Sequence, residues 1–106
     1  MPVKTTQKNL YEANIVIRPN VGDDNLKGVV SKIESAIKNF GGDIVRIDEP
    51  FTRRFTHKMK GFKDGYYVCF LFNSNPDLPN TLKRTLAISD DVLRYMIVKK
   101  ENEKWV

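Results

Sequence analysis

The sequence predicts an α+β domain in which a single β-sheet carries two helices on one of its faces. Two segments place apolar residues three and four positions apart, as an amphipathic helix requires. Four other segments have the alternation or the short apolar runs of strands. These segments follow in the order strand, helix, strand, strand, helix, strand. The length of 106 residues fits one domain with a substantial core.

The first half of the chain predicts a strand, a helix and a second strand. Residues 10–17 alternate in polarity, and Pro19 ends this strand because it has no amide hydrogen to donate. We expect Asp23 and Asp24 to cap the helix that follows. Two glycines end that helix, and residues 43–48 form the second strand. The apolar stripe of the helix consists of Leu26, Val29, Val30, Ile33, Ala36, Ile37 and Phe40.

The second half of the chain predicts two more strands and another helix. Residues 66–72 are almost wholly apolar or aromatic, which indicates a central strand covered on both faces. The preceding Asp64-Gly65 is a turn signal, and the basic segment before it is expected to be a strand extension and a loop. Leucines four residues apart indicate a helix over residues 78–86, and residues 92–99 form the last strand.

This order, βαββαβ, is that of the ferredoxin-like sandwich, a four-stranded antiparallel sheet with both helices on one face. We take residues 10–100 as the domain, residues 1–9 as a flexible leader and residues 101–106 as a short tail. The other face of the sheet is left open, and its mixture of apolar and charged groups suits a partner protein better than bulk water. From the first and last strands it would present Glu12, Asn14, Arg94, Met96 and Val98.

The positive charge of the chain is concentrated in one segment. Residues 53–63 carry five fixed positive charges and no acid, and the net charge of the whole chain is +5. A basic segment beside a neutral remainder is typical of proteins that bind nucleic acid. The same segment contains Phe55, His57 and Phe62, flat groups that can stack on bases. The alternative is a solvated hairpin loop whose lysines only keep the protein soluble.

Nothing in the sequence indicates an enzyme, a metal site or a bound cofactor. It has no Gly-rich phosphate loop and no metal-ligand spacing. The only cysteine, Cys69, lies between Val68 and Phe70 and is expected to be a buried thiol on a strand. The Asp90-Asp91 pair precedes a strand, where acids commonly fill turns. No apolar run approaches the roughly 20 residues of a membrane helix, and the start is too polar for a secretory signal.

Two other classes of function occur on this fold. An RNA recognition motif would need Tyr11 on the open face to stack a base, and residues 10–15 and 60–70 partly resemble its two motifs. Strand phase argues against it, because Tyr11 shares its face with apolar residues and the opposite register would bury Glu12. A small-ligand regulatory module would need a Gly-rich or Asp-rich loop, for which residues 22–24 are the only candidate.

Over about residues 10–100 the chain resembles the family of bacterial-type small-subunit ribosomal protein six. Four pieces carry the resemblance: Tyr11-Glu12 with Asn14-Ile15-Val16 and Arg18-Pro19, Gly41-Gly42 before Ile44, Arg53-Arg54-Phe55 with Lys58, Lys60 and Gly65-Tyr66-Tyr67, and residues 91–99. The last piece is the most specific. The chain departs from the family at residues 55–57, where members usually have Leu-Ala-Tyr, and at residues 60–64, which replace an Asn-rich or Lys-rich turn.

The resemblance implies a structural, non-enzymatic protein of the small ribosomal subunit that needs no cofactor. Members bind the central domain of small-subunit ribosomal RNA as a pair with small-subunit ribosomal protein eighteen, among other small-subunit proteins and away from membranes. Both the bacterial cytoplasm and the mitochondrial matrix are compatible with the sequence. The residues expected to contact RNA are Arg53, Arg54, Lys58, Lys60, Lys63 and Arg94. Those expected to contact the partner protein are Glu12, Asn14, Met96 and Val98.

Several of these residues also have purely structural interpretations. Lys60 and Lys63 flank a glycine and fit a solvated turn equally well. Arg94 has the alternative of an ion pair with Glu12 across the sheet. Phe62 is either a stacking group or a hydrophobic plug of the hairpin.

Overall fold

The structure, a computed structural model, describes residues 9–100. Within this range the elements are β1 (Asn9–Ile17), the short 3-10 helix η1 (Pro19–Val21), α1 (Asp23–Asn39), β2 (Asp43–Ile47), β3 (Phe51–Met59), β4 (Phe62–Ser74), α2 (Leu78–Ala87) and β5 (Val92–Lys100). Apart from Asn9, the predicted leader and tail lie outside the described residues. The strands form one antiparallel sheet in the order β2-β4-β1-β5, and β3 pairs with the remaining part of β4.

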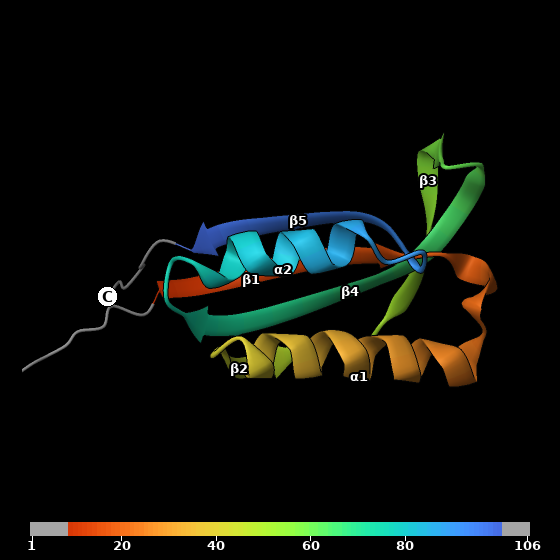
Figure 1. The fold of residues 1–106 in the computed structure, drawn as a ribbon. Helices are drawn as coiled ribbons and strands as arrows, with labels where there is room; N and C mark the ends of the chain where they lie inside the picture. The colour runs from red at the N-terminus through yellow and green to blue at the C-terminus, as the bar shows by residue number, and fades with distance from the viewer. Residues whose placement is uncertain (1–8, 101–106) are drawn as a thin grey trace, which may run out of the picture.

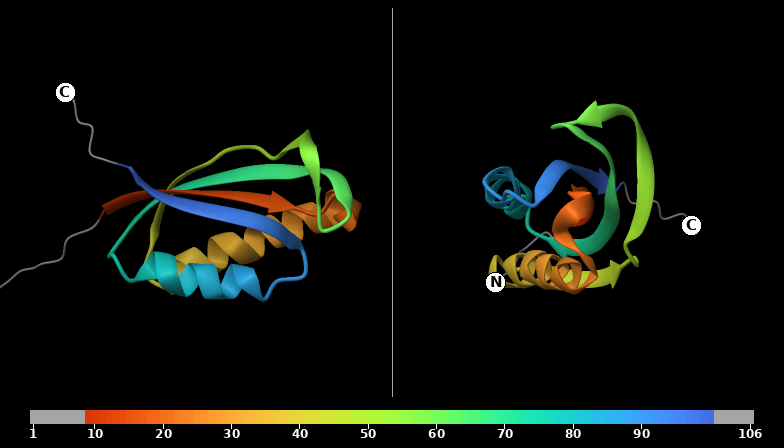
Figure 2. Two further views of the ribbon diagram at one scale, coloured as in Figure 1. Left: turned by 90° about the horizontal axis from the view of Figure 1, so that it is seen from above. Right: turned by 90° about the vertical axis from the view of Figure 1, so that its right-hand side faces the viewer.

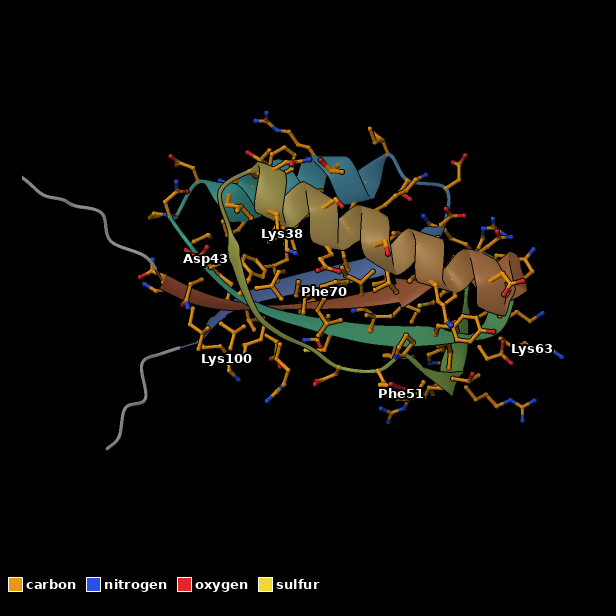
Figure 3. All side chains as sticks on the ribbon, turned by 90° about the horizontal axis from the view of Figure 1, so that it is seen from below. Lys38, Asp43, Phe51, Lys63, Phe70 and Lys100 are labelled. Atoms are coloured by element: carbon orange, nitrogen blue, oxygen red, sulfur yellow. The ribbon has the colours of Figure 1, made fainter. Side chains whose placement is uncertain are left out.

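Both helices cover the same face of the sheet (Figure 1; Figure 2), so the predicted ferredoxin-like sandwich is confirmed. The core lies between these two layers, where Phe70 is fully buried (Figure 3). Tyr11 is in this core, 7% exposed, with its ring centroid 5.8 Å from that of Phe72. The strand phase predicted for Tyr11 is therefore correct, and the base-stacking position of an RNA recognition motif is absent there.

The described part of the sheet has five strands rather than the predicted four. β2 pairs with residues 70–73 of β4, and β3 pairs with residues 62–67 of the same strand. β2 and β3 thus pair with successive parts of the same edge of β4, and the residues between Ile47 and Phe51 separate the two strands. Pro50 lies in this interruption, and it has no amide hydrogen for the ladder. The predicted strand extension is therefore a separate strand.

The turn between β3 and β4 lies at Lys60-Gly61, not at Asp64-Gly65 as predicted. Met59 and Phe62 are paired, which leaves a two-residue loop. Its residues have φ angles of +48° and +87°. Positive φ at both loop positions is typical of the type I′ turn, whose twist matches that of a β-hairpin. β4 is consequently longer than predicted, and residues 64 and 65 lie within it.

Gly65 is required by close packing rather than by a turn. A Cβ atom at this position would lie 2.8 Å from the carbonyl oxygen of Ile17 and 3.0 Å from the Phe55 ring. Because the oxygen belongs to the backbone of a neighbouring strand, it has little freedom to move. The absent side chain therefore lets the Ile17 carbonyl oxygen of β1 and the Phe55 ring of β3 both lie close to β4.

The connection from β1 to α1 also differs from the prediction. Gly22, with a φ of +86°, takes the N-cap position of α1, so Asp23 and Asp24 lie within the helix rather than at its cap. At the end of β1, the Arg18 guanidinium contacts the Asp91 carboxylate at 2.7 and 2.9 Å, and the Arg18 amide donates to the Asp91 carbonyl at 2.9 Å. Asp91 therefore ties β1 to the start of β5, in agreement with its predicted structural role.

Candidate nucleic-acid and partner interface

The basic segment forms the β3–β4 hairpin, which projects from one end of the sheet (Figure 1) and curves out of its plane (Figure 2). All six residues expected to contact RNA are exposed, and in residues 9–100 none of them forms an ion pair with an acid. Exposed cations without acidic partners remain available to phosphate groups. These residues are Arg53, Arg54, Lys58, Lys60, Lys63 and Arg94.

Four of the six predicted RNA residues meet around one hollow of about 550 Å³. Arg53, Arg54 and Lys58 approach from the hairpin, and Arg94 approaches from β5. The remaining two do not line it, since Lys60 occupies the tip of the hairpin and Lys63 lies on β4 beyond the turn. No acid lines this hollow, which we call the basic hollow. Its full lining is Arg53, Arg54, Phe55, Thr56, His57, Lys58, Met59, Tyr67 and Arg94.

An aromatic cluster supports the basic hollow. Phe51 stacks on Tyr67 with ring centroids 5.6 Å apart and an interplanar angle of 19°. Phe55 meets the same Tyr67 ring edge-on at 6.1 Å, and the Arg53 guanidinium lies 5.7 Å from its centroid. The sequence prediction included neither Tyr67 nor Phe51. The alternation of residues along β3 and β4 is a signal that could have placed both rings on the open face. It was not used because the sequence predicted that β4 is covered on both faces.

The four residues expected to contact a partner protein lie together on the open face of the sheet. Glu12 is opposite Val98 and Asn14 is opposite Met96 in the β1–β5 ladder. Opposite residues of antiparallel strands point to the same face and lie side by side. Met96 is 50% exposed and Val98 is 37% exposed, so this face presents apolar area to its surroundings.

One residue of the open face is buried by its neighbours. Val16 is only 5% exposed, although it points away from the helices. In the ladders it lies between Tyr67 on β4 and Arg94 on β5. Met59, from the hairpin, joins these three residues around a smaller and mainly apolar hollow of about 190 Å³. The hairpin and the open face are therefore one continuous surface.

Cys69 and Glu12 lie side by side on the open face. The Cys69 thiol donates a hydrogen bond to Glu12 at 3.3 Å, and Lys100 forms an ion pair with the same carboxylate at 3.6 Å. Cys69 is thus half-buried on the open face, rather than in the core as expected. Desolvation, the hydrogen bond to Glu12 and the negative charges of Glu12 and Asp48 raise the pKa of Cys69 to about 12, against a smaller opposing effect of Arg46. The thiol is therefore not an activated nucleophile.

The suggested ion pair between Arg94 and Glu12 is not formed. Arg94 lies opposite Val16 in the ladder, four pairs away from the Glu12–Val98 pair, and Glu12 is engaged by Lys100 and Cys69 instead. Arg94 lines the basic hollow instead.

Residues 9–100 contain no group of three or more His, Cys, Asp or Glu side chains that could hold a metal ion. None of the described helices is long and apolar enough to cross a membrane.

Comparison with known proteins identifies the family. The family model described as ribosomal protein S6 matches residues 10–99. The small ribosomal subunit protein bS6 of Moorella thermoacetica is 37% identical over 93 residues, which cover 88% of this chain and 95% of the relative. The protein of the same name from Heliobacterium modesticaldum is 33% identical over 93 residues, covering 88% and 97% of the two chains.

The fold agrees with this family. The crystal structure of 30S ribosomal protein S6 from Thermotoga maritima superposes with a TM-score of 0.85, at 20% sequence identity, over 89% of each chain. The family model and the curated relatives, rather than this fold similarity, assign the function class, because one fold supports many functions. The chain therefore belongs to the ribosomal protein S6 family, and it is a protein of the small ribosomal subunit and not an enzyme.

Proposed function

We propose that this protein binds the central domain of small-subunit ribosomal RNA through the β3–β4 hairpin, together with small-subunit ribosomal protein eighteen on the open face of the sheet. The observation that carries the RNA part is the set of six exposed cations without acidic partners in residues 9–100, four of which converge on one hollow. Neutralising phosphates with such groups releases counterions from the RNA, which drives binding.

The partner part of the proposal is supported by the apolar area of the open face. Met96 and Val98 are half-exposed beside Asn14 and Glu12, and the face continues without interruption into the basic hollow. One partner seated on this face would lie next to RNA held by the hairpin, so that the two proteins form a joint surface. The relatives named above are bacterial, which favours the bacterial cytoplasm over the mitochondrial matrix as the compartment.

The RNA part can be tested by replacing Arg53 and Arg54 with alanine. Two exposed charge pairs, each worth up to about 1 kcal/mol, predict a loss of affinity of up to about thirtyfold for a central-domain RNA fragment presented with ribosomal protein eighteen. Both side chains are exposed, so the unfolding free energy should change by no more than about 0.5 kcal/mol for Arg54 and about 1 kcal/mol for Arg53, which also contacts the Tyr67 ring. The measurement is a filter-binding titration together with urea unfolding.

The matched control is Lys83→Ala with Arg84→Ala. This pair is also adjacent, basic and exposed, but it lies on α2, away from the hairpin. It should leave RNA affinity unchanged within about twofold. An equal loss of affinity in both double variants would show that the net charge of the protein, and not the hairpin, binds the RNA.

The partner part can be tested with Met96→Glu. A charge in the centre of an apolar contact should abolish or greatly weaken binding of ribosomal protein eighteen, as followed by isothermal titration calorimetry. Ile88→Glu is the control, because Ile88 is 83% exposed but follows α2 on the opposite side of the sheet. Unchanged binding by the Met96 variant would exclude the open face as the partner surface.

A further inference from the structure

The basic hollow differs from an ordinary phosphate-binding surface in what covers its walls. Cations surround it, but Phe55, Tyr67 and Met59 also line it, and these three side chains offer ring faces and apolar area. Phosphate groups alone make no use of such walls. A nucleobase does, since it carries a flat apolar face and is attached to a phosphate that needs a cation nearby.

The aromatic wall is held in place before any ligand binds. Phe51 stacks on one face of the Tyr67 ring, Phe55 contacts this ring edge-on, and the Arg53 guanidinium lies over it. Phe55 in turn packs over Gly65, where no side chain competes for the space. A wall fixed by such contacts loses little conformational entropy when a ligand packs against it.

We propose that the basic hollow binds a single unpaired nucleotide of an RNA, with its base packed on Phe55 beside Tyr67 and its phosphate held by Arg94 and Arg54. The nucleotide is unpaired because the ring faces of bases within an A-form helix are covered by their stacking neighbours. This inference rests on the proposed RNA-binding function of the hairpin and adds which form of RNA the hairpin recognises.

The charges of the hollow favour RNA over a segment of a protein. Four fixed cations line it, without any acid, and RNA phosphates complement their charge. The smaller hollow beside it has Val16 and Met96 in its lining and is mainly apolar, so it suits a protein side chain better. Met59, Tyr67 and Arg94 line both hollows and mark the boundary between the two kinds of ligand.

The test compares two RNA oligomers with the same backbone charge. One is a ten-nucleotide adenosine strand, and the other has the same length but abasic riboses in place of its four central nucleotides. Base stacking predicts that the wild-type protein binds the first oligomer at least about fivefold more tightly than the second. Phe55→Leu should reduce this preference to less than about twofold. The control Phe40→Leu, at the far end of α1, should retain it, since Phe40 is 37% exposed and remote from the hairpin.

A second measurement needs no variant and therefore does not depend on the folding of Phe55→Leu. The ring protons of Phe55 and Tyr67 should shift upfield in the NMR spectrum of the wild-type protein on titration with the adenosine oligomer, and not with the abasic one. Equal binding of both oligomers, or no binding of either, would overturn the nucleotide site. If the central-domain fragment with ribosomal protein eighteen still binds, the proposed function survives that result. If this fragment also fails to bind at low salt, the proposed function fails as well.

Discussion

At the scale of single residues, Gly65 is a position where the backbone of a neighbouring strand leaves no room for a side chain. We expect Gly65→Ala to destabilise the protein by about 1–3 kcal/mol, because the new Cβ would meet the Ile17 carbonyl oxygen at 2.8 Å. Gly28→Ala is the control. It lies exposed within α1 with no atom within 4 Å of its Cβ position, and it should stabilise the protein by up to about 1 kcal/mol. Urea unfolding of both variants measures the difference, and equal stabilities would contradict the close packing at Gly65.

Cys69 allows a second prediction about a single residue. Its pKa is raised to about 12, first by desolvation and then by Glu12, so the thiol stays protonated at pH 8 in the folded protein. Since the thiolate is the reacting form, iodoacetamide should modify the native protein at least about tenfold more slowly than the urea-unfolded chain. Glu12→Gln removes the negative charge, lowers the pKa and should speed the native reaction. Equal rates in the native and unfolded protein would exclude the raised pKa.

At the scale of elements, the tip of the hairpin contains a strained position. Lys60 has a φ of +48°, the only positive value among the non-glycine residues that the structure describes. Asparagine adopts this conformation more readily and is favoured in type I′ turns. Lys60→Asn should therefore raise the unfolding free energy by about 0.5 kcal/mol while removing one cation. Lys63→Asn removes a cation from a strand position instead, where asparagine is disfavoured, and thermal unfolding should show no gain in stability. A gain of equal size in both variants would assign the effect to charge rather than to the turn.

The same hairpin shows why some elements could be predicted from the sequence and others could not. α1 and α2 were predicted nearly to their ends, because their apolar periodicity reflects the packing that stabilises them. The turn was misplaced because Asp64-Gly65 is the commoner turn dipeptide, whereas Lys60-Gly61 carries a weaker signal. Only the tertiary contact with Ile17 explains the glycine at position 65, and such a contact has no local signature.

At the scale of the whole molecule, the cations of the site could be predicted but the hollow could not. Charge clustering identifies Arg53, Arg54 and Lys58 without any structure. Arg94 meets them because β1 brings β4 and β5 together and because Val16 lies between Tyr67 and Arg94. A one-residue change of register would turn Tyr67 and Arg94 toward the helices. The hollow is therefore a property of the sheet topology, and the sequence predicts only the groups that line it.

The charge distribution of the whole molecule leads to a prediction that separates local from global electrostatics. If five phosphates are neutralised, the logarithm of RNA affinity should fall with the logarithm of salt concentration at a slope of roughly −3.5 to −4.5. Arg53→Ala with Arg54→Ala should flatten that slope by about 1.5, whereas Lys83→Ala with Arg84→Ala should leave it unchanged. Each double variant lowers the net charge from +5 by two, to +3, so long-range attraction is reduced to the same extent in both. A salt titration from 0.05 to about 0.3 M measures the slopes. Equal flattening of the slope in both double variants would mean that the net charge of the whole protein attracts the RNA. Flattening in the hairpin variant alone would locate the phosphate contacts at Arg53 and Arg54.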